Sequence, residues 1–177
     1  MKNLILITFT LLCSILQTNA QTKKEIDNGL FVTFPSEPDY KTTNSASTFV
    51  TKTENCIFMV LIQRNAIPNY SEYVKAKQKW SALEIAKVEN SFLDNAVKGK
   101  LDYTGNSGTV SSIKVGKFSG RYISYSAINP ATGERGMRYT KLFLVRDKAI
   151  SFEVWFLNDS ETAKIEKESF LNSIKTQ

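Results

Sequence analysis

The chain has 177 residues, with 23 basic and 17 acidic side chains, and it contains no histidine. The absence of imidazole excludes Ser-His-Asp and Cys-His catalysis and the zinc sites that rely on histidine ligands. Basic residues are scattered along the chain and never form a run of five, so the charge pattern does not predict nucleic-acid binding.

The first 20 residues have the pattern of a secretory signal peptide. Lys2 precedes an apolar run from Leu4 to Leu16, and Ala20 supplies a small residue before the expected cleavage point. The run is interrupted by polar residues and is shorter than the roughly 20 residues that cross a membrane. We therefore expect an exported protein, periplasmic or extracellular, with no transmembrane segment in its mature chain. Residues 21–28 are expected to be a flexible leader, and residues 29–177 a single domain.

The first part of this domain predicts strands. Residues 30–34, LFVTF, predict a strand that ends at Pro35, because proline has no N–H to donate to a neighbouring strand. Residues 47–52 and 56–64 predict a hairpin. Its second arm, CIFMVLIQR, is almost continuously apolar, so we expect a central strand that is covered on both faces. Cys56, at the head of this arm, is expected to be a buried and unreactive thiol.

Residues 70–98 lack Gly and Pro and are rich in helix formers, so they predict a long helix that ends at Gly99. At 100° per residue, five apolar side chains fall within one stripe, which we expect to face the sheet: Val74, Ile85, Val88, Phe92 and Ala96. Trp80 and Leu83 lie off this stripe. We expect both to pack in a broad core; the alternatives are a bent helix, two separate helices, or a position for Trp80 at the rim of the core.

The rest of the chain predicts an antiparallel meander closed by a helix. Strands are expected at residues 101–103, 109–115, 117–126, 137–146 and 149–157. Asn158 and Glu161 have the spacing of a helix start, and one apolar face follows, made of Ala163, Phe170, Leu171 and Ile174. The expected fold class is α+β: an α/β/α sandwich with a mostly antiparallel central sheet, a long helix after the first hairpin and a C-terminal helix.

This order of elements resembles the PsbP-like, or PsbP/DcrB-like, exported bacterial proteins. The residues that carry the resemblance are Phe31, Val32, Phe34, Pro35, Pro38, the stretch Phe152–Phe156, Phe170, Leu171 and Ser173. It implies a PsbP fold with helices on both faces of the sheet, and a class of accessory or scaffold proteins. Plant members assist the oxygen-evolving photosystem, and a eukaryotic relative in nuclear transport binds a small GTPase. Neither role carries over, since the chain lacks histidines and a long N-terminal docking extension.

Four basic side chains from neighbouring strands are the first candidate site: Arg121, Arg135, Arg138 and Lys141. If they converge, their donors match a carboxylate, a phosphate or an acidic partner; the alternative is scattered surface charge. A second candidate is an aromatic surface made by Trp155 and Tyr139, with Tyr122 and Tyr125 as further contributors. The alternative is that these rings belong to the core.

The sequence predicts no catalytic, cofactor-binding or metal-binding residues. Acidic pairs occur at Glu37/Asp39, Asp159/Glu161 and Glu166/Glu168, and nothing in their spacing places two carboxylates across a cleft. We therefore expect a non-enzymatic accessory or binding module of the cell envelope, whose partner is an envelope protein or a small ligand. The alternatives are a carboxylate-dependent enzyme acting on envelope polysaccharide, and a carrier with an apolar cavity between sheet and helix.

Overall fold

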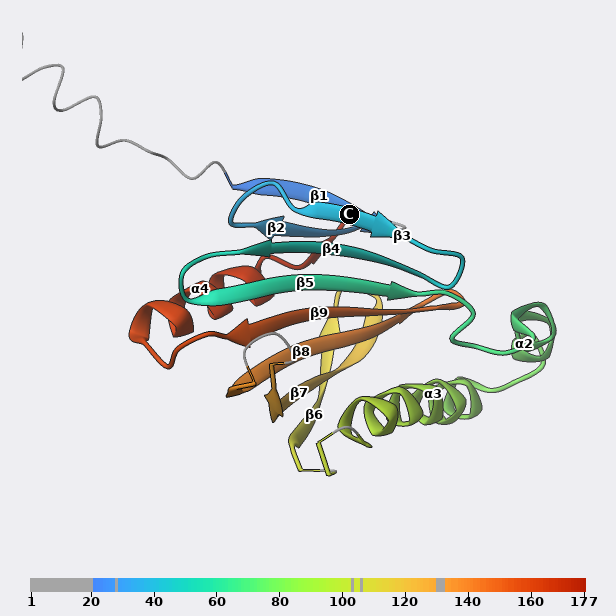
Figure 1. The fold of residues 1–177 in the computed structure, drawn as a ribbon. Coiled ribbons are helices and arrows are strands. Elements are labelled where there is room, and N and C mark those ends of the chain that lie inside the picture. The colour runs from blue at the N-terminus through green and yellow to red at the C-terminus, as the bar shows by residue number, and fades with distance from the viewer. Residues whose placement is uncertain (1–20, 28, 103, 106, 130–132) are drawn as a thin grey trace, which may run out of the picture.

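A computed structural model describes residues 21–27, 29–102, 104–105, 107–129 and 133–177, and the predicted signal peptide lies outside this part. Two antiparallel sheets form the described fold (Figure 1). The smaller has the order β1-β2-β10, with bounds Thr22–Asp27, Leu30–Phe34 and Lys175–Thr176. The larger has the order β3-β4-β5-β9-β8-β7-β6, with β3 Asp39–Thr42, β4 Ala46–Lys52, β5 Cys56–Gln63, β6 Thr109–Val115, β7 Phe118–Ile128, β8 Arg135–Val145 and β9 Lys148–Phe156.

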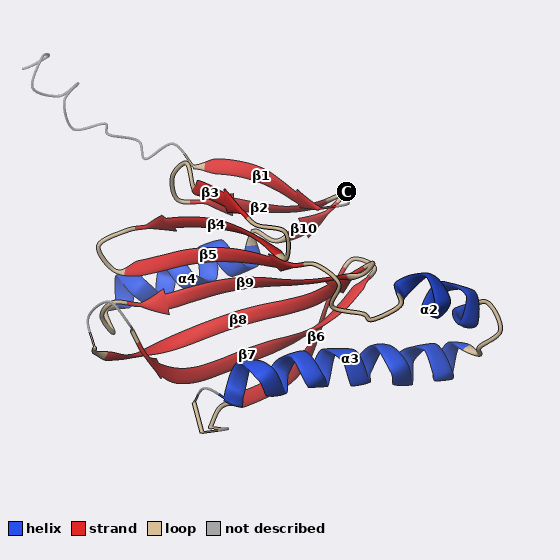
Figure 2. Ribbon diagram, turned by 45° about the vertical axis from the view of Figure 1, so that its right-hand side comes forward, coloured by secondary structure: helices blue, strands red, loops and turns tan. Residues whose placement is uncertain are grey.

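The α+β class and the mostly antiparallel sheet are confirmed. Helix α4, Glu161–Asn172, and helix α3, Ala82–Asp102, cover opposite faces of the large sheet (Figures 1 and 2). Strand β2 ends before Pro35, as predicted, and the chain then crosses from the small sheet into β3 of the large one. None of the described helices is both long and apolar enough to cross a membrane.

The prediction of a flexible leader is wrong, because residues 22–27 form strand β1, paired with β2. Ile26 of this strand is buried in the core, and the ammonium of Lys24 lies 2.5 Å from a carboxylate oxygen of Glu37. The signal that predicts this hairpin is the Asn28-Gly29 pair in the sequence. Gly29 has φ of 76°, in the left-handed region that glycine adopts without strain.

Helix α4 and the small sheet together close one face of the large sheet. The core on this face contains Phe58 of β5, Phe152 of β9, Phe34 of β2 and Phe170 of α4, all nearly or fully buried. Ser160 caps α4 by accepting a hydrogen bond from the N–H of Ala163, two residues later than the predicted cap. The predicted apolar face of this helix is confirmed, because all four of its residues are buried.

The predicted long helix is two helices, α2 at Tyr70–Lys77 and α3. Ser81 and Glu84 start the second one with reciprocal hydrogen bonds, Ser81 N–H to the Glu84 carboxylate and Glu84 N–H to the Ser81 hydroxyl. Trp80 lies in the break with its ring against Tyr73 of α2. Leu83 is 80% exposed, so its expected place in the core is wrong. Gly99 lies inside α3, and residues 101–102 are helical rather than the start of a strand.

The side of α3 that packs on the sheet also differs from the prediction. Its buried residues are Leu93, Val97 and Leu101, which join the second core with Ile123 and Leu142. Helix α3 makes its main contacts with strands β7 and β8 rather than with the apolar strand β5. The predicted stripe passes through Phe92 and Ala96, each one residue before a buried residue, and therefore lies to one side of the buried contact.

Candidate functional site

The uncovered part of strand β5 creates the candidate site. Along β5 every second side chain, Cys56, Phe58, Val60 and Ile62, is buried on the α4 face. The intervening Ile57, Met59 and Leu61 are only half-buried. The expectation that both faces of this strand are covered is therefore wrong. Across the sheet, the predicted stripe of α3, including Phe92 and Ala96, is also only half-buried.

Leu61 from the first surface and Phe92 and Ala96 from the second line a groove of about 720 Å³, which we call the α3 groove. Strands β5, β8 and β9 supply its floor, and α3 supplies one wall. Its lining residues are Leu61, Gln63, Ala66, Pro68, Phe92, Asn95, Ala96, Gly99, Lys100, Leu142, Leu144, Ala149 and Ser151. Lys100 is the one charged side chain among them. The volume and the mainly apolar lining are typical of a site for a small organic ligand.

A buried carboxylate lies beneath one end of the groove. Glu153 of β9 is 2% exposed, and its oxygens accept hydrogen bonds from three side chains. The Lys100 ammonium donates at 2.6 Å and the Ser151 hydroxyl at 2.9 Å to one oxygen, and the Trp155 indole N–H donates at 3.0 Å to the other. Glu153 therefore connects a groove wall, through Lys100, with the end of β9.

These contacts decide the charge of Glu153. Burial alone would raise the pKa of its carboxyl, but the charge of Lys100 and the hydrogen bonds from Lys100, Trp155 and Ser151 together lower it below the ordinary value. The side chain is thus an ionised, satisfied carboxylate paired with a cation. Such a group orients Lys100 and Trp155, whereas a general acid needs a raised pKa.

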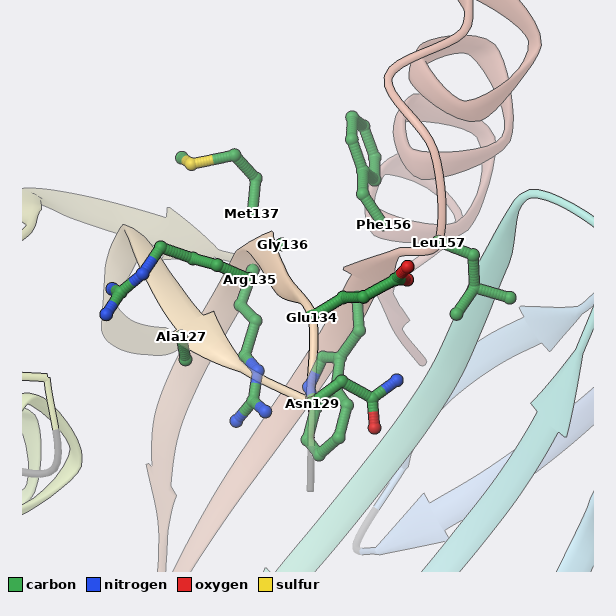
Figure 3. A pocket seen from close by; sticks show the side chains of 10 residues that line it. Ala127, Asn129, Glu134, Arg135, Gly136, Met137, Phe156 and Leu157 are labelled. Carbon is green, nitrogen blue, oxygen red and sulfur yellow. The ribbon is translucent and has the colours of Figure 1, made fainter. Parts of the chain in front are cut away.

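A second hollow, of about 340 Å³, lies on the other side of Glu153, and we call it the arginine hollow. It is lined by Thr104, Ser126, Ala127, Ile128, Arg135, Arg138 and Trp155. The guanidinium of Arg138 lies 3.6 Å from the centre of the Trp155 ring and donates a 2.9 Å hydrogen bond to the Ile128 carbonyl. Figure 3 shows an adjoining notch of about 40 Å³, where Glu134 points away from Arg135.

The four predicted basic residues do not converge into one site. Arg135 and Arg138 both line the arginine hollow. Arg121 is buried on the α3 face, where its guanidinium is bound to Asp94 at 2.8 Å and Asn90 at 2.8 Å. Lys141 points to the α4 face and donates to the carbonyl oxygen of Leu171 at 2.9 Å. Strand alternation directs Lys141 and Arg138 to opposite faces of β8, whereas Arg135, the first residue of the strand, lines the hollow although it is also three residues from Arg138.

The predicted aromatic surface is divided between the two faces in the same way. Trp155 faces the α3 side and contributes to the arginine hollow. Tyr139 faces the α4 side, where its ring lies 4.9 Å from that of Phe156, with the ammonium of Lys167 over it. Tyr122 packs against the core of that face, and Tyr125 is buried in the core beneath α3. Trp155 alone of these rings lines the site.

The acidic pairs of the sequence lie away from both hollows. Glu37 pairs with Lys24, Glu168 pairs with Lys167, and Glu166 accepts hydrogen bonds from Thr53 and Asn55. None of the six paired acidic residues lines the α3 groove or the arginine hollow. Within the described ranges, no three Cys, Asp or Glu side chains gather in a way that would hold a metal ion. Cys56 is buried, and burial raises the pKa of its thiol to about 12.

Comparison with known proteins gives no family. No family model matches the chain, and no curated protein matches it. Among solved structures, a crystal structure from Bacteroides thetaiotaomicron VPI-5482, at 1.50 Å resolution, is similar with a TM-score of 0.46 and 13% identity. The match covers 89% of this chain and 49% of that one, so the chain spans about half the length of that structure.

Sequence reasoning did not find the groove, although parts of its signal are present. The apolar run of β5 and the stripe that contains Phe92 and Ala96 both predict burial, and each is left half-exposed. Glu153 and Lys100 were not singled out. A lone acid between Phe152 and Val154 in a strand as apolar as β9 is a signal of a paired, buried carboxylate.

Proposed function

We propose that this protein is a non-enzymatic binding module of the bacterial cell envelope, exported to the periplasm or beyond, which acts by holding a ligand or partner in the α3 groove. The PsbP-like resemblance of its sequence is part of this proposal, since it implies accessory or scaffold proteins rather than enzymes. One observation carries the proposal. Leu61 of β5 and the residues Phe92 and Ala96 of α3 line a common groove in which none of the three is fully buried.

The physical argument is that the groove leaves apolar surface in contact with water on both of its sides. Burying such surface stabilises a complex by about 25 cal/mol for each Å². The other face of the same strand shows what full cover looks like, because Phe58 and Val60 are almost inaccessible there. The incomplete cover on the α3 side therefore favours a bound component over a purely structural role.

Gly99 allows the proposal to be tested without damage to the fold. A Cβ built at Gly99 meets no atom within 4 Å, and the residue lies in α3 where it lines the groove. We therefore expect a Gly99→Phe side chain to enter the groove without a clash. Ser91→Phe is the matched control, since Ser91 is exposed on the same helix and lines neither hollow.

The experiment is crosslinking and recovery of bound components from envelope fractions, with the protein purified after export. Both proteins and extractable small molecules are identified. We expect at least one component to be recovered with the unaltered protein and with Ser91→Phe, and to be lost with Gly99→Phe. Equal recovery by all three proteins would show that the groove is not the binding surface, and would overturn the proposal.

A further inference from the structure

The charges around the two hollows point to one class of ligand. The α3 groove has a single charged lining residue, Lys100, and the arginine hollow has two, Arg135 and Arg138. All three are cationic. No acidic residue of the described chain lines either space, and the one carboxylate between them, Glu153, is buried and paired with Lys100. Glu134 lines the adjoining notch beside Arg135 and Arg138, so the three cationic side chains exceed the two nearby carboxylates, Glu134 and Glu153, by one charge.

The two hollows also differ in polarity. The groove floor is formed by aliphatic side chains, chiefly Leu61, Leu142 and Leu144, and its polar lining is limited to Gln63, Asn95, Lys100 and Ser151. The Lys100 ammonium and Ser151 hydroxyl both donate to Glu153. The arginine hollow instead presents guanidinium groups beside an indole ring. A mainly apolar groove and a cationic hollow thus lie on either side of Glu153.

Glu153 fixes the distance between these parts. Lys100, at the end of the groove, and Trp155, on the wall of the arginine hollow, are bound to opposite oxygens of one carboxylate. One residue, Glu153, therefore joins the lining of the groove to the lining of the arginine hollow, although the two spaces share no lining residue. A flexible molecule with an apolar body and a charged end can reach from one space to the other.

We infer that the ligand is a single-chain anionic amphiphile of the fatty-acid type, with its alkyl chain in the α3 groove and its carboxylate at Arg135 and Arg138. This inference rests on the proposed function and names the chemistry of the ligand for the same site. A peptide is a poorer match, because an extended peptide needs hydrogen-bond partners along its backbone, and the groove offers few free polar groups. A sugar is also a poorer match, because its hydroxyl groups need hydrogen-bond partners and the groove offers few.

Titration calorimetry with monomeric dodecanoate tests the inference. We expect dodecanoate to bind, and octanoate to bind at least about tenfold more weakly, because each buried CH2 contributes severalfold to affinity. We expect Gly99→Phe to weaken dodecanoate binding at least about tenfold, and Ser91→Phe to leave it unchanged. No binding of dodecanoate, or equal binding by both variants, would overturn the inference.

The charged end is tested separately with dodecyltrimethylammonium, which has the same chain and a cationic end. We expect it to bind at least about tenfold more weakly than dodecanoate. The double variant R135Q and R138Q should lower dodecanoate affinity by about tenfold and should not lower that of the cationic probe. Equal affinity for the two probes would show that the cationic site plays no part, and would overturn the assignment of an anion.

A membrane surface is the competing source of the same chemistry, so sedimentation with vesicles of phosphatidylglycerol and phosphatidylcholine is a further arm. Co-sedimentation that depends on Arg135 and Arg138, but is unaffected by Gly99→Phe, would assign the site to membrane adhesion and overturn the uptake of a single chain. Should dodecanoate fail to bind while Gly99→Phe still abolishes recovery of an envelope component, the inferred ligand falls and the proposed function stands. If dodecanoate does not bind and Gly99→Phe also leaves the recovery of envelope components unchanged, both the inferred ligand and the proposed function are wrong.

Discussion

The two faces of strand β5 differ in burial, although their side chains alternate along the same eight residues. Toward α4, Phe58 and Val60 are enclosed by helix α4 and the small sheet. Toward α3, Met59 and Leu61 are only half-buried, and Leu61 lines a groove. The comparison teaches that one apolar strand serves both stability and binding, because its two-residue period separates the two roles by a single position.

The largest difference expected between the faces concerns their packing. Phe58→Ala should lower the free energy of unfolding by about 3–5 kcal/mol, because it leaves a cavity in a closed core. Met59→Ala, at the next residue, should lower it by only about 1 kcal/mol, because its side chain is already half in contact with water. Urea unfolding of both variants measures this. Equal losses would mean that the α3 face is as closed as the α4 face.

The buried charge pair of the α3 face gives the next largest effect. Lys100→Ala should destabilise the protein by about 3 kcal/mol near neutral pH, because Glu153 then lies buried without its cation. Lys98→Ala is the control: Lys98 is exposed on the same helix, and its loss should change stability by less than about 0.5 kcal/mol.

The pH dependence of this pair follows from the lowered pKa of Glu153. A carboxyl whose pKa is lowered on folding adds stability above its unfolded pKa, and this stability is lost as the pH falls through the folded pKa. In Lys100→Ala, burial instead raises the pKa, so Glu153 takes up a proton as the pH is lowered. The stability gap between the two proteins should narrow from pH 7 to pH 4. A gap that stays constant would show that Glu153 carries no charge in the fold.

The smallest expected change in the free energy of unfolding is a gain in stability rather than a loss. Gly99→Ala should stabilise the protein by about 0.5–1 kcal/mol, because alanine favours a helix and the new Cβ enters the open groove. Gly120 is the matched position facing the closed α4 core. Its Cβ would lie 2.4 Å from the Leu142 carbonyl oxygen, so Gly120→Ala should destabilise by about 1–3 kcal/mol. Thermal unfolding distinguishes the signs, and a loss at Gly99 would contradict an open groove.

The sequence predicts most strands of the large sheet and the closing helix, because their apolar periods are local. Residues 30–34 and 109–115 match strands β2 and β6, and the predicted apolar residues of the closing helix are buried, three of them in α4 and Ile174 just after it. The short strands β3 and β10 were not predicted. Their residues are mainly polar, and they become strands through pairing with distant segments rather than through their own pattern.

Apolar periodicity does not locate the residues of the α3 groove. The apolar residues of α3 form two neighbouring stripes, one through Phe92 and Ala96 and one through Leu93 and Val97, and periodicity alone does not show which one meets the sheet. The choice depends on where the helix lies across strands β7 and β8. Only two of the four predicted basic residues, Arg135 and Arg138, line one hollow, and β8 directs Lys141 to the opposite face.

The strand at residues 175–176 sets an order of events for folding. Strand β2 pairs on one side with β1, its neighbour in the sequence, and on the other with β10, where Thr176 lies opposite Leu30. The β1–β2 hairpin can therefore form early during synthesis, whereas β2 can pair with β10 only after the last residues have been made. Until then this edge of β2 lacks its β10 partner and is open to pairing with a wrong strand. A chain that lacks its last few residues would keep this edge unpaired by β10.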